Sequence, residues 1–208
     1  FGAPVTGERI VFVLDRSLQM TDAHGLAKEE QRDRLAELCA PKGYDRIPWR
    51  QLKTRMQLAQ AHIRHVVGHL PQSARFEVIY FAEDVAGVFG KKFVPPNTAS
   101  KKTLDDVFAK LQTDDGINVW EALMTAFDLG GATEDRALKG GPEQIFLVLN
   151  NLPTKGDVTD PDPLERGVVF KARVRGVPVH VVDMGANPQI LADRLAKGTG
   201  GTYLDLTK

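Results

Sequence analysis

An acidic side chain and a hydroxyl side chain follow the first apolar run of this sequence. Residues 9–14 (Arg-Ile-Val-Phe-Val-Leu) lead into Asp15, and Ser17 comes two positions later. In open α/β sheets, ligands bind in the crevice at the carboxyl ends of the strands, so both side chains would direct oxygen atoms to one place. Such oxygens suit a hard cation such as Mg²⁺. The alternative is that Asp15 has a local role and orders its loop through hydrogen bonds.

Three histidines form a second candidate metal group. His62, His65 and His69 lie at spacings of three and four in a stretch with helical periodicity, so they share one face. Imidazoles placed in this way can bind Zn²⁺ or Ni²⁺. No cysteine or acid completes a tetrahedral set, and the face is expected to lie away from the apolar stripe. We therefore interpret the three histidines as a solvent-exposed face.

The elements that would position these side chains follow from the hydrophobic pattern. Short apolar runs alternate with stretches in which apolar residues recur every three or four positions. This alternation predicts an α/β fold with a parallel, doubly wound sheet covered by helices. Strands are expected at 9–14, 75–82, 85–94, 144–149, 177–183 and 202–206. Helices are expected at 56–70, 98–111, 119–127 and 188–197, and a further helix is expected to end at about Arg175.

Two of the strands are expected to be central and adjacent. The runs 9–14 and 144–149 are apolar on both faces, as expected for strands that are buried under helices on both sides. The predicted core therefore includes five residues on these strands and their neighbour: Val11, Val13, Ile79, Phe146 and Val148.

A charged segment separates the first strand from the helix that follows it. We interpret 21–51 as an insertion carried above the sheet, 1–7 as a linker, and 1–208 as one domain. The insertion carries Tyr44 and Trp49 among several arginines. Because aromatic residues and arginine dominate interface hot spots, these two aromatic residues are a candidate recognition surface.

Composition excludes several classes of function. The 27 Lys and Arg residues balance the 27 Asp and Glu residues, so no global field attracts nucleic acid. No apolar run approaches the length of a membrane span. The sequence also lacks a Gly-x-Ser-x-Gly elbow and both glycine-rich phosphate motifs. Since the chain begins at Phe1, we expect it to be a portion of a longer polypeptide.

The ordered motifs resemble those of the von Willebrand factor type A domain, particularly its bacterial members. The matching segments cover nearly the whole chain: Asp-x-Ser after the first strand, Phe-x-Val-Ile-x-Phe, Asn-Val-Trp-Glu-Ala-Leu, Ile-Phe-Leu-Val-Leu-Asn-Asn-Leu-Pro-Thr and Gly-Val-Pro-Val-His-Val-Val-Asp-Met-Gly. The resemblance implies a Rossmann-like, mostly parallel sheet of about six strands with one antiparallel edge strand. It also implies protein recognition through a metal ion-dependent adhesion site, where Mg²⁺ accepts a carboxylate from the partner.

The resemblance locates five positions of that adhesion site, and this chain keeps two of them. Asp15 and Ser17 match, whereas Gln19 replaces a serine, Ile117 a threonine and Asn150 the strand-end aspartate. Hard cations need charge and rigid oxygen ligands, so we expect the site to have lost its metal. The three substitutions Gln19→Ser, Ile117→Thr and Asn150→Asp are together expected to create a Mg²⁺ site.

The sequence therefore favours a non-catalytic protein-protein interaction or scaffold module with no cofactor. Its partner would be another protein or the rest of a larger polypeptide, and the resemblance favours the cell envelope or a secreted location. Asp114 and Asp115 leave one alternative open, because they could replace the missing ligands and retain a Mg²⁺-dependent adhesion or regulatory domain. A cryptic hydrolase at the same crevice is the other alternative.

Overall fold

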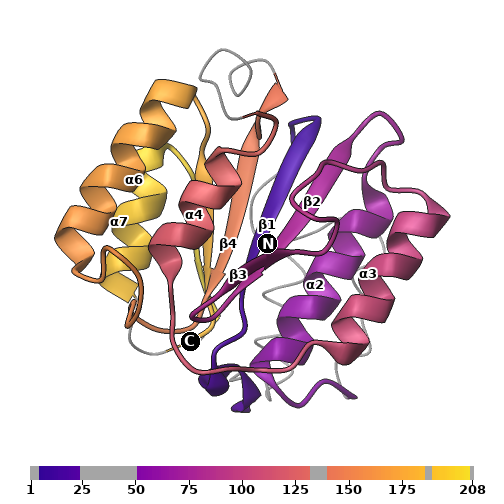
Figure 1. The fold of residues 1–208 in the computed structure, drawn as a ribbon, viewed down its shortest axis with the longest axis horizontal. Coiled ribbons are helices and arrows are strands. Elements are labelled where there is room, and N and C mark those ends of the chain that lie inside the picture. Colours follow the sequence, from indigo (N-terminus) through magenta and orange to yellow (C-terminus); the bar gives the residue numbers. More distant parts are fainter. Residues whose placement is uncertain (1–4, 24–50, 132–139, 186–188, 207–208) are drawn as a thin grey trace.

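A six-stranded sheet forms the centre of the computed structural model, which describes residues 5–23, 51–131, 140–185 and 189–206 (Figure 1). The strand order is β3-β2-β1-β4-β5-β6, and only β3 is antiparallel to its neighbour. The strands are β1 Arg9–Asp15, β2 Arg75–Phe81, β3 Val85–Gly87, β4 Gln144–Leu149, β5 Val179–Asp183 and β6 Tyr203–Asp205. The Rossmann-like architecture and the central, adjacent positions of β1 and β4 are confirmed.

Helices cover both faces of this sheet (Figure 1). They are the 3-10 turn η1 Leu18–Thr21 and the α-helices α2 Arg55–His69, α3 Thr98–Lys110, α4 Val119–Phe127, α6 Pro161–Arg175 and α7 Gln189–Thr199. Apolar residues of α2 and α3 pack on one face, and those of α4, α6 and α7 pack on the other. The parallel strands end at the lower edge in Figure 1, where η1 follows β1.

The two faces of β1 explain why its sequence is apolar throughout. Ile10, Phe12 and Leu14 enter the core under α2 and α3, while Val11 and Val13 enter the core under α4, α6 and α7. A strand with helices on both sides has no solvent face, so the alternation of polar and apolar residues disappears. The predicted core is confirmed, since Val11, Val13, Ile79, Phe146 and Val148 are all fully buried.

The edge strand is shorter than the sequence suggests. β3 covers three residues rather than 85–94, and Val94 instead forms an isolated bridge with Phe76. Between the two, Gly90 and Lys91 have positive φ angles of 68° and 62°. A left-handed turn interrupts extended pairing, so the apolar run 85–94 folds into a strand, a turn and a bridge.

The three histidines on α2 do not share one exposed face. The helix expected at 56–70 is α2, but His62 is buried on it, so the prediction that the three histidines form one solvent face is wrong. An apolar stripe wider than the Met56–Ile63–Leu70 line explains the burial.

Most of the 21–51 insertion, including Tyr44 and Trp49, lies outside the described residues. None of the helices within the described ranges is long and apolar enough to cross a membrane.

Candidate functional site

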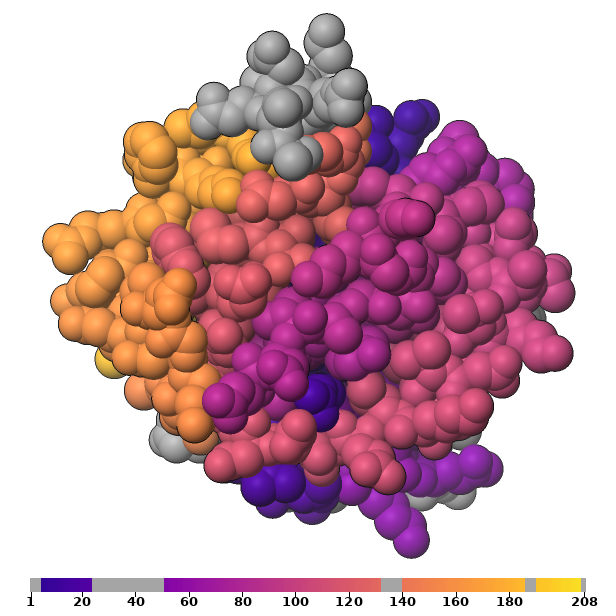
Figure 2. All heavy atoms as spheres, viewed as in Figure 1, coloured from indigo at the N-terminus to yellow at the C-terminus, as the bar shows by residue number. Residues whose placement is uncertain are grey.

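Three polar side chains converge at the carboxyl ends of the three central strands. Asp15 ends β1, Asn150 follows β4, and Asp183 ends β5. These strands are neighbours in the order β1-β4-β5, and all three side chains are buried. In Figure 2 the indigo N-terminal residues reach the surface at this lower edge, next to pink residues of the segment before α4. The edge predicted from Asp15 and Ser17 is the polar end of the sheet.

Backbone N–H groups occupy both oxygens of the Asp15 carboxylate. Ser17 N–H donates to Oδ1 over 2.7 Å, and Asn150 N–H donates to Oδ2 over 3.1 Å. Burial raises the pKa of Asp15 to about 6, and the two backbone hydrogen bonds oppose this shift. The local role considered for Asp15 is present in the structure, because its carboxylate joins the end of β1 to the end of β4.

Ser17 and Gln19, the next two positions of the expected metal-ligand set, differ in burial. Ser17 is buried, and its side chain acts together with the two backbone N–H groups to lower the pKa of Asp15. Gln19 lies in η1, where it is exposed. The contact that Gln19 makes toward the site comes from its main-chain carbonyl, which accepts from Arg55 Nη1 over 3.4 Å. The long Gln19 side chain therefore belongs to the surface.

Ile117 belongs to the hydrophobic core. Its side chain is 2% exposed and lies in the same cluster as Val13 and Phe81, under α4. Its carbonyl accepts hydrogen bonds from the N–H groups of Thr154 and Lys155. The backbone at position 117 thus links two loops of the edge, and its side chain contributes packing rather than a ligand.

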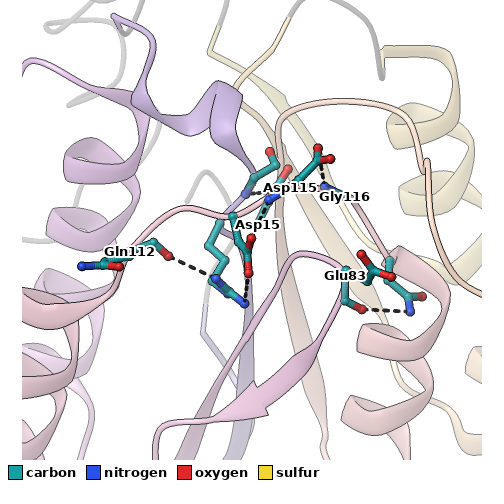
Figure 3. Close-up of polar contacts among 9 residues, drawn as sticks. Asp15, Glu83, Gln112, Asp115 and Gly116 are labelled. Carbon is teal, nitrogen blue, oxygen red and sulfur yellow. Dashed lines mark hydrogen bonds and ion pairs between the residues drawn. The ribbon is translucent and has the colours of Figure 1, made fainter.

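Asp114 and Asp115 have partners of their own in the loop before α4. Asp114 Oδ2 lies 3.3 Å from Arg16 Nη2, and Asp115 Oδ1 accepts from Gly116 N–H over 2.8 Å. Figure 3 shows Asp15 at the end of its strand, with the loop through Gln112, Asp115 and Gly116 beside it and Glu83 on the neighbouring connection. Both acids are exposed on this loop. Their contacts do not direct them toward the carboxylate of Asp15.

Arg55 is the residue of this site that the sequence reasoning missed. Its Nη1 donates to Asn150 Oδ1 over 2.9 Å and lies 3.2 Å from Asp22 Oδ2. Arg55 is the first residue of α2, after a capping box made by Thr54 and Gln57. A cation is unfavourable at a helix N-terminus, and the first turn of α2 holds no acid. The unfavourable position of Arg55 at a helix N-terminus is a feature of the sequence that could have indicated a partner outside α2.

Asp183 is the second residue that was missed as a member of the site. Its Oδ1 accepts from Gly185 N–H and its Oδ2 from the Tyr203 hydroxyl, each over 3.0 Å. Burial raises the pKa of Asp183 to about 6, while these hydrogen bonds and the charge of Arg55 act in the opposite direction. An acid at the end of an apolar run, the pattern that singled out Asp15, is also found here.

The site combines two buried acids with one guanidinium group. Asp15 and Asp183 flank Asn150. Arg55 donates a hydrogen bond to Asn150, and its positive charge lowers the pKa of Asp183. Within the described part of the chain, no group of three His, Cys, Asp or Glu side chains is placed to hold a metal ion. The guanidinium group of Arg55 is the positively charged group that contacts Asn150.

Comparisons with known proteins give structural matches only. No protein-family model matches the sequence, and the curated protein sequences give no match. Solved structures do match, among them the von Willebrand factor type A protein from Catenulispora acidiphila, at 14% identity and a TM-score of 0.61. That alignment covers 96% of this chain and 40% of the other chain.

Two further structures show the same architecture. An aerotolerance-related membrane protein from Bacteroides fragilis aligns at 16% identity and a TM-score of 0.58, over 96% of this chain and 91% of that one. Proximal thread matrix protein 1 from the mussel byssus, with zinc in its adhesion-site motif, aligns at 12% identity and a TM-score of 0.54, over 95% of this chain and 44% of its own length. The chain therefore has the fold of a von Willebrand factor type A domain.

Proposed function

We propose that this chain is a non-catalytic protein-binding or scaffold module whose edge site works without a divalent cation. The observation that carries the proposal is the double hydrogen bonding of Asp15 by Ser17 and Asn150. These hydrogen bonds give Asp15 a structural role without a metal ion, and one charge from Asp15 with one neutral oxygen from Ser17 is a poor ligand set for Mg²⁺, which gives up its water reluctantly. Ile117 supports the same proposal, because the position where the resemblance places a threonine ligand holds an apolar side chain that is buried in the core.

The fold neighbours support a binding role without naming a partner. A von Willebrand factor type A protein and a byssal thread matrix protein share the architecture. We propose that the partner is another protein or a further part of the same polypeptide. The aerotolerance-related membrane protein also supports a location in the cell envelope. Fractionation of the source cells with immunodetection tests that location.

Isothermal titration with Mg²⁺, Mn²⁺ and Ca²⁺ tests the metal-independent function. The protein is first treated with EDTA and then exchanged into chelator-free buffer. We expect no saturable heat at millimolar cation, because Asp15 and Ser17 offer one charge and one neutral oxygen. Saturable binding that disappears in Asp15→Ala would establish the metal-dependent alternative instead. The Asp105→Ala variant serves as the matched control, since that acid is exposed on α3 and pairs with Arg64.

A further inference from the structure

We infer that the outer face of α6 docks on the same face of a second copy of this chain, with the two helices antiparallel. The inference goes beyond the proposed binding function, since it concerns a helix surface rather than the polar end of the sheet. α6 lies at the left edge of the fold in Figure 1. Five exposed residues at helical spacing define what we call the α6 face: Asp162, Arg166, Phe170, Arg173 and Val174.

Two large apolar side chains on the α6 face are open to solvent. Phe170 is 72% exposed and Val174 is 60% exposed, and the two lie one helical turn apart. Single exposed apolar residues are ordinary on protein surfaces, whereas neighbouring ones offer contiguous apolar area to a partner. The inner side of the helix is already used by the core, where Leu164, Val168 and Ala172 are buried. The α6 face therefore holds the apolar area of this helix that remains to be covered.

The charges along α6 decide how a second copy can approach. The helix follows the N-cap Asp160 and has Asp162 in its first turn, whereas Arg173 and Arg175 lie in its last turn. An antiparallel copy places the acidic start of one helix beside the basic end of the other, and a parallel copy places like charges together. The two helix dipoles favour the antiparallel orientation as well. The α6 face is thus self-complementary in one orientation.

One acid and one base on this helix remain available for pairing between copies. Arg194 pairs with Asp162 within the chain. Asp160 and Arg173 are exposed and make hydrogen bonds with the main chain, but neither forms an ion pair within the described ranges. These two side chains lie at opposite ends of α6. We therefore expect Asp160 of each copy to meet Arg173 of the other.

Arg166 and Phe170 meet in the middle of the antiparallel pair. When the two helices cross near Val168, Arg166 of one copy lies opposite Phe170 of the other, and the two-fold symmetry repeats this contact. A guanidinium group over an aromatic ring is attractive. Arg166 is exposed and forms no ion pair within the described part of the chain, so its guanidinium is available for this contact.

An anionic membrane is the other surface that attracts an aromatic residue flanked by arginines. Asp160 and Asp162 oppose that attraction, because they lie at the start of the same helix and repel anionic lipid. Flotation with vesicles of phosphatidylglycerol and phosphatidylcholine tests this occupant. We expect the chain to remain unbound. Vesicle binding by a monomer that Phe170→Ser abolishes would overturn the inference.

Sedimentation velocity over a concentration series, in buffer with EDTA, tests the self-association. Because one helix-to-helix contact is smaller than a standard interface, we expect a reversible dimer with a Kd on the order of 100 μM. Phe170→Ser and Arg173→Glu should each raise the Kd at least tenfold, and added salt should raise it for the unchanged chain. Circular dichroism verifies that each variant is folded.

Ile190→Ser is the matched control, since Ile190 is 75% exposed on α7 and lies outside the α6 face. We expect this variant to dimerise like the unchanged chain. A chain that stays monomeric throughout the series overturns the inference. A dimer that Phe170→Ser leaves unchanged also overturns it, because the contact would then lie elsewhere.

Crosslinking tests the antiparallel orientation. In a Cys39→Ser background, Asp162→Cys and Val174→Cys each place one thiol near an end of the α6 face. Positions 162 and 174 of different copies lie opposite each other in an antiparallel pair, whereas the two copies of position 162 are about 18 Å apart along the helix. A short bismaleimide should therefore link the mixed variants and neither variant alone. Efficient links within each variant alone would overturn the antiparallel docking.

Discussion

The N–H of Asn150 donates to Oδ2 of Asp15 over 3.1 Å and thereby joins the ends of β4 and β1. Asp15→Ala removes the acceptor of this N–H and of Ser17 N–H, and both donors are buried. Leaving two buried donors unsatisfied should lower the free energy of unfolding by roughly 2–4 kcal/mol. Urea denaturation measures the loss, and Asp115→Ala, on the exposed loop, should change stability by less than about 0.5 kcal/mol.

The two buried acids predict how stability depends on pH. Asp15 and Asp183 have a folded pKa of about 6, above their ordinary value of 3.8. Between these values the folded chain binds more protons than the unfolded chain, so the free energy of unfolding falls as pH rises from about 4 to about 6. Each acid should contribute on the order of 2–3 kcal/mol to this fall.

Asparagine variants check the origin of that pH dependence. Asp15→Asn combined with Asp183→Asn should flatten the stability profile between pH 4.5 and pH 7, measured by chemical denaturation. Glu77, a third buried acid with a raised pKa, should retain its own part of the slope. A profile that is equally steep in the double variant would show that these two acids do not titrate as described.

The core prediction concerns packing on the two faces of the sheet. Phe146→Ala and Val13→Ala each remove fully buried groups from a central strand. We expect losses of about 3–5 kcal/mol for the phenylalanine and about 2–3 kcal/mol for the valine, because a cavity remains. Val174→Ala, at a position that is 60% exposed on α6, is the control. Losses below about 1 kcal/mol at both core positions would contradict the assigned packing.

Removal of Arg55 should strengthen a restored metal site. The changes Gln19→Ser, Ile117→Thr and Asn150→Asp supply the missing oxygens, but the new carboxylate at 150 would face Arg55 Nη1, now 2.9 Å from Asn150 Oδ1. A guanidinium paired with that carboxylate competes with Mg²⁺. We expect Mg²⁺ to bind at least tenfold more tightly when Arg55→Ala is added. Equal affinities by calorimetry would show that Arg55 does not occupy the cation's place.

Deletion of residues 24–47 should leave the domain folded. The two ends of the insertion are already paired, because Ala23 forms a bridge with Thr54 and Asp22 accepts from Arg55 N–H over 3.0 Å. A shorter connection between adjacent ends changes the loop-closure entropy only slightly. Circular dichroism and thermal denaturation measure the outcome. Loss of cooperative unfolding would mean that the insertion contributes to the core.

The sequence alone determined the architecture because its signals are local. Residues 9–14 and 144–149 form apolar runs, a pattern typical of strands covered on both faces. The helices are recognised from apolar residues that recur every three or four positions, so this pattern is also local. The same local reading placed Asp15 at the carboxyl end of the first strand. It placed His62 on the wrong face, since helical spacing does not reveal how wide the buried stripe will be.

Tertiary structure decided the chemistry of the site. Arg55 and Asn150 are separated by 95 positions, and no local pattern announces that their side chains meet. Their contact exists because α2 begins at the edge where β4 ends, which depends on the packing of the whole sheet. For the same reason, the burial of Ile117 and the raised pKa of Asp183 emerge only when distant segments exclude water from that edge.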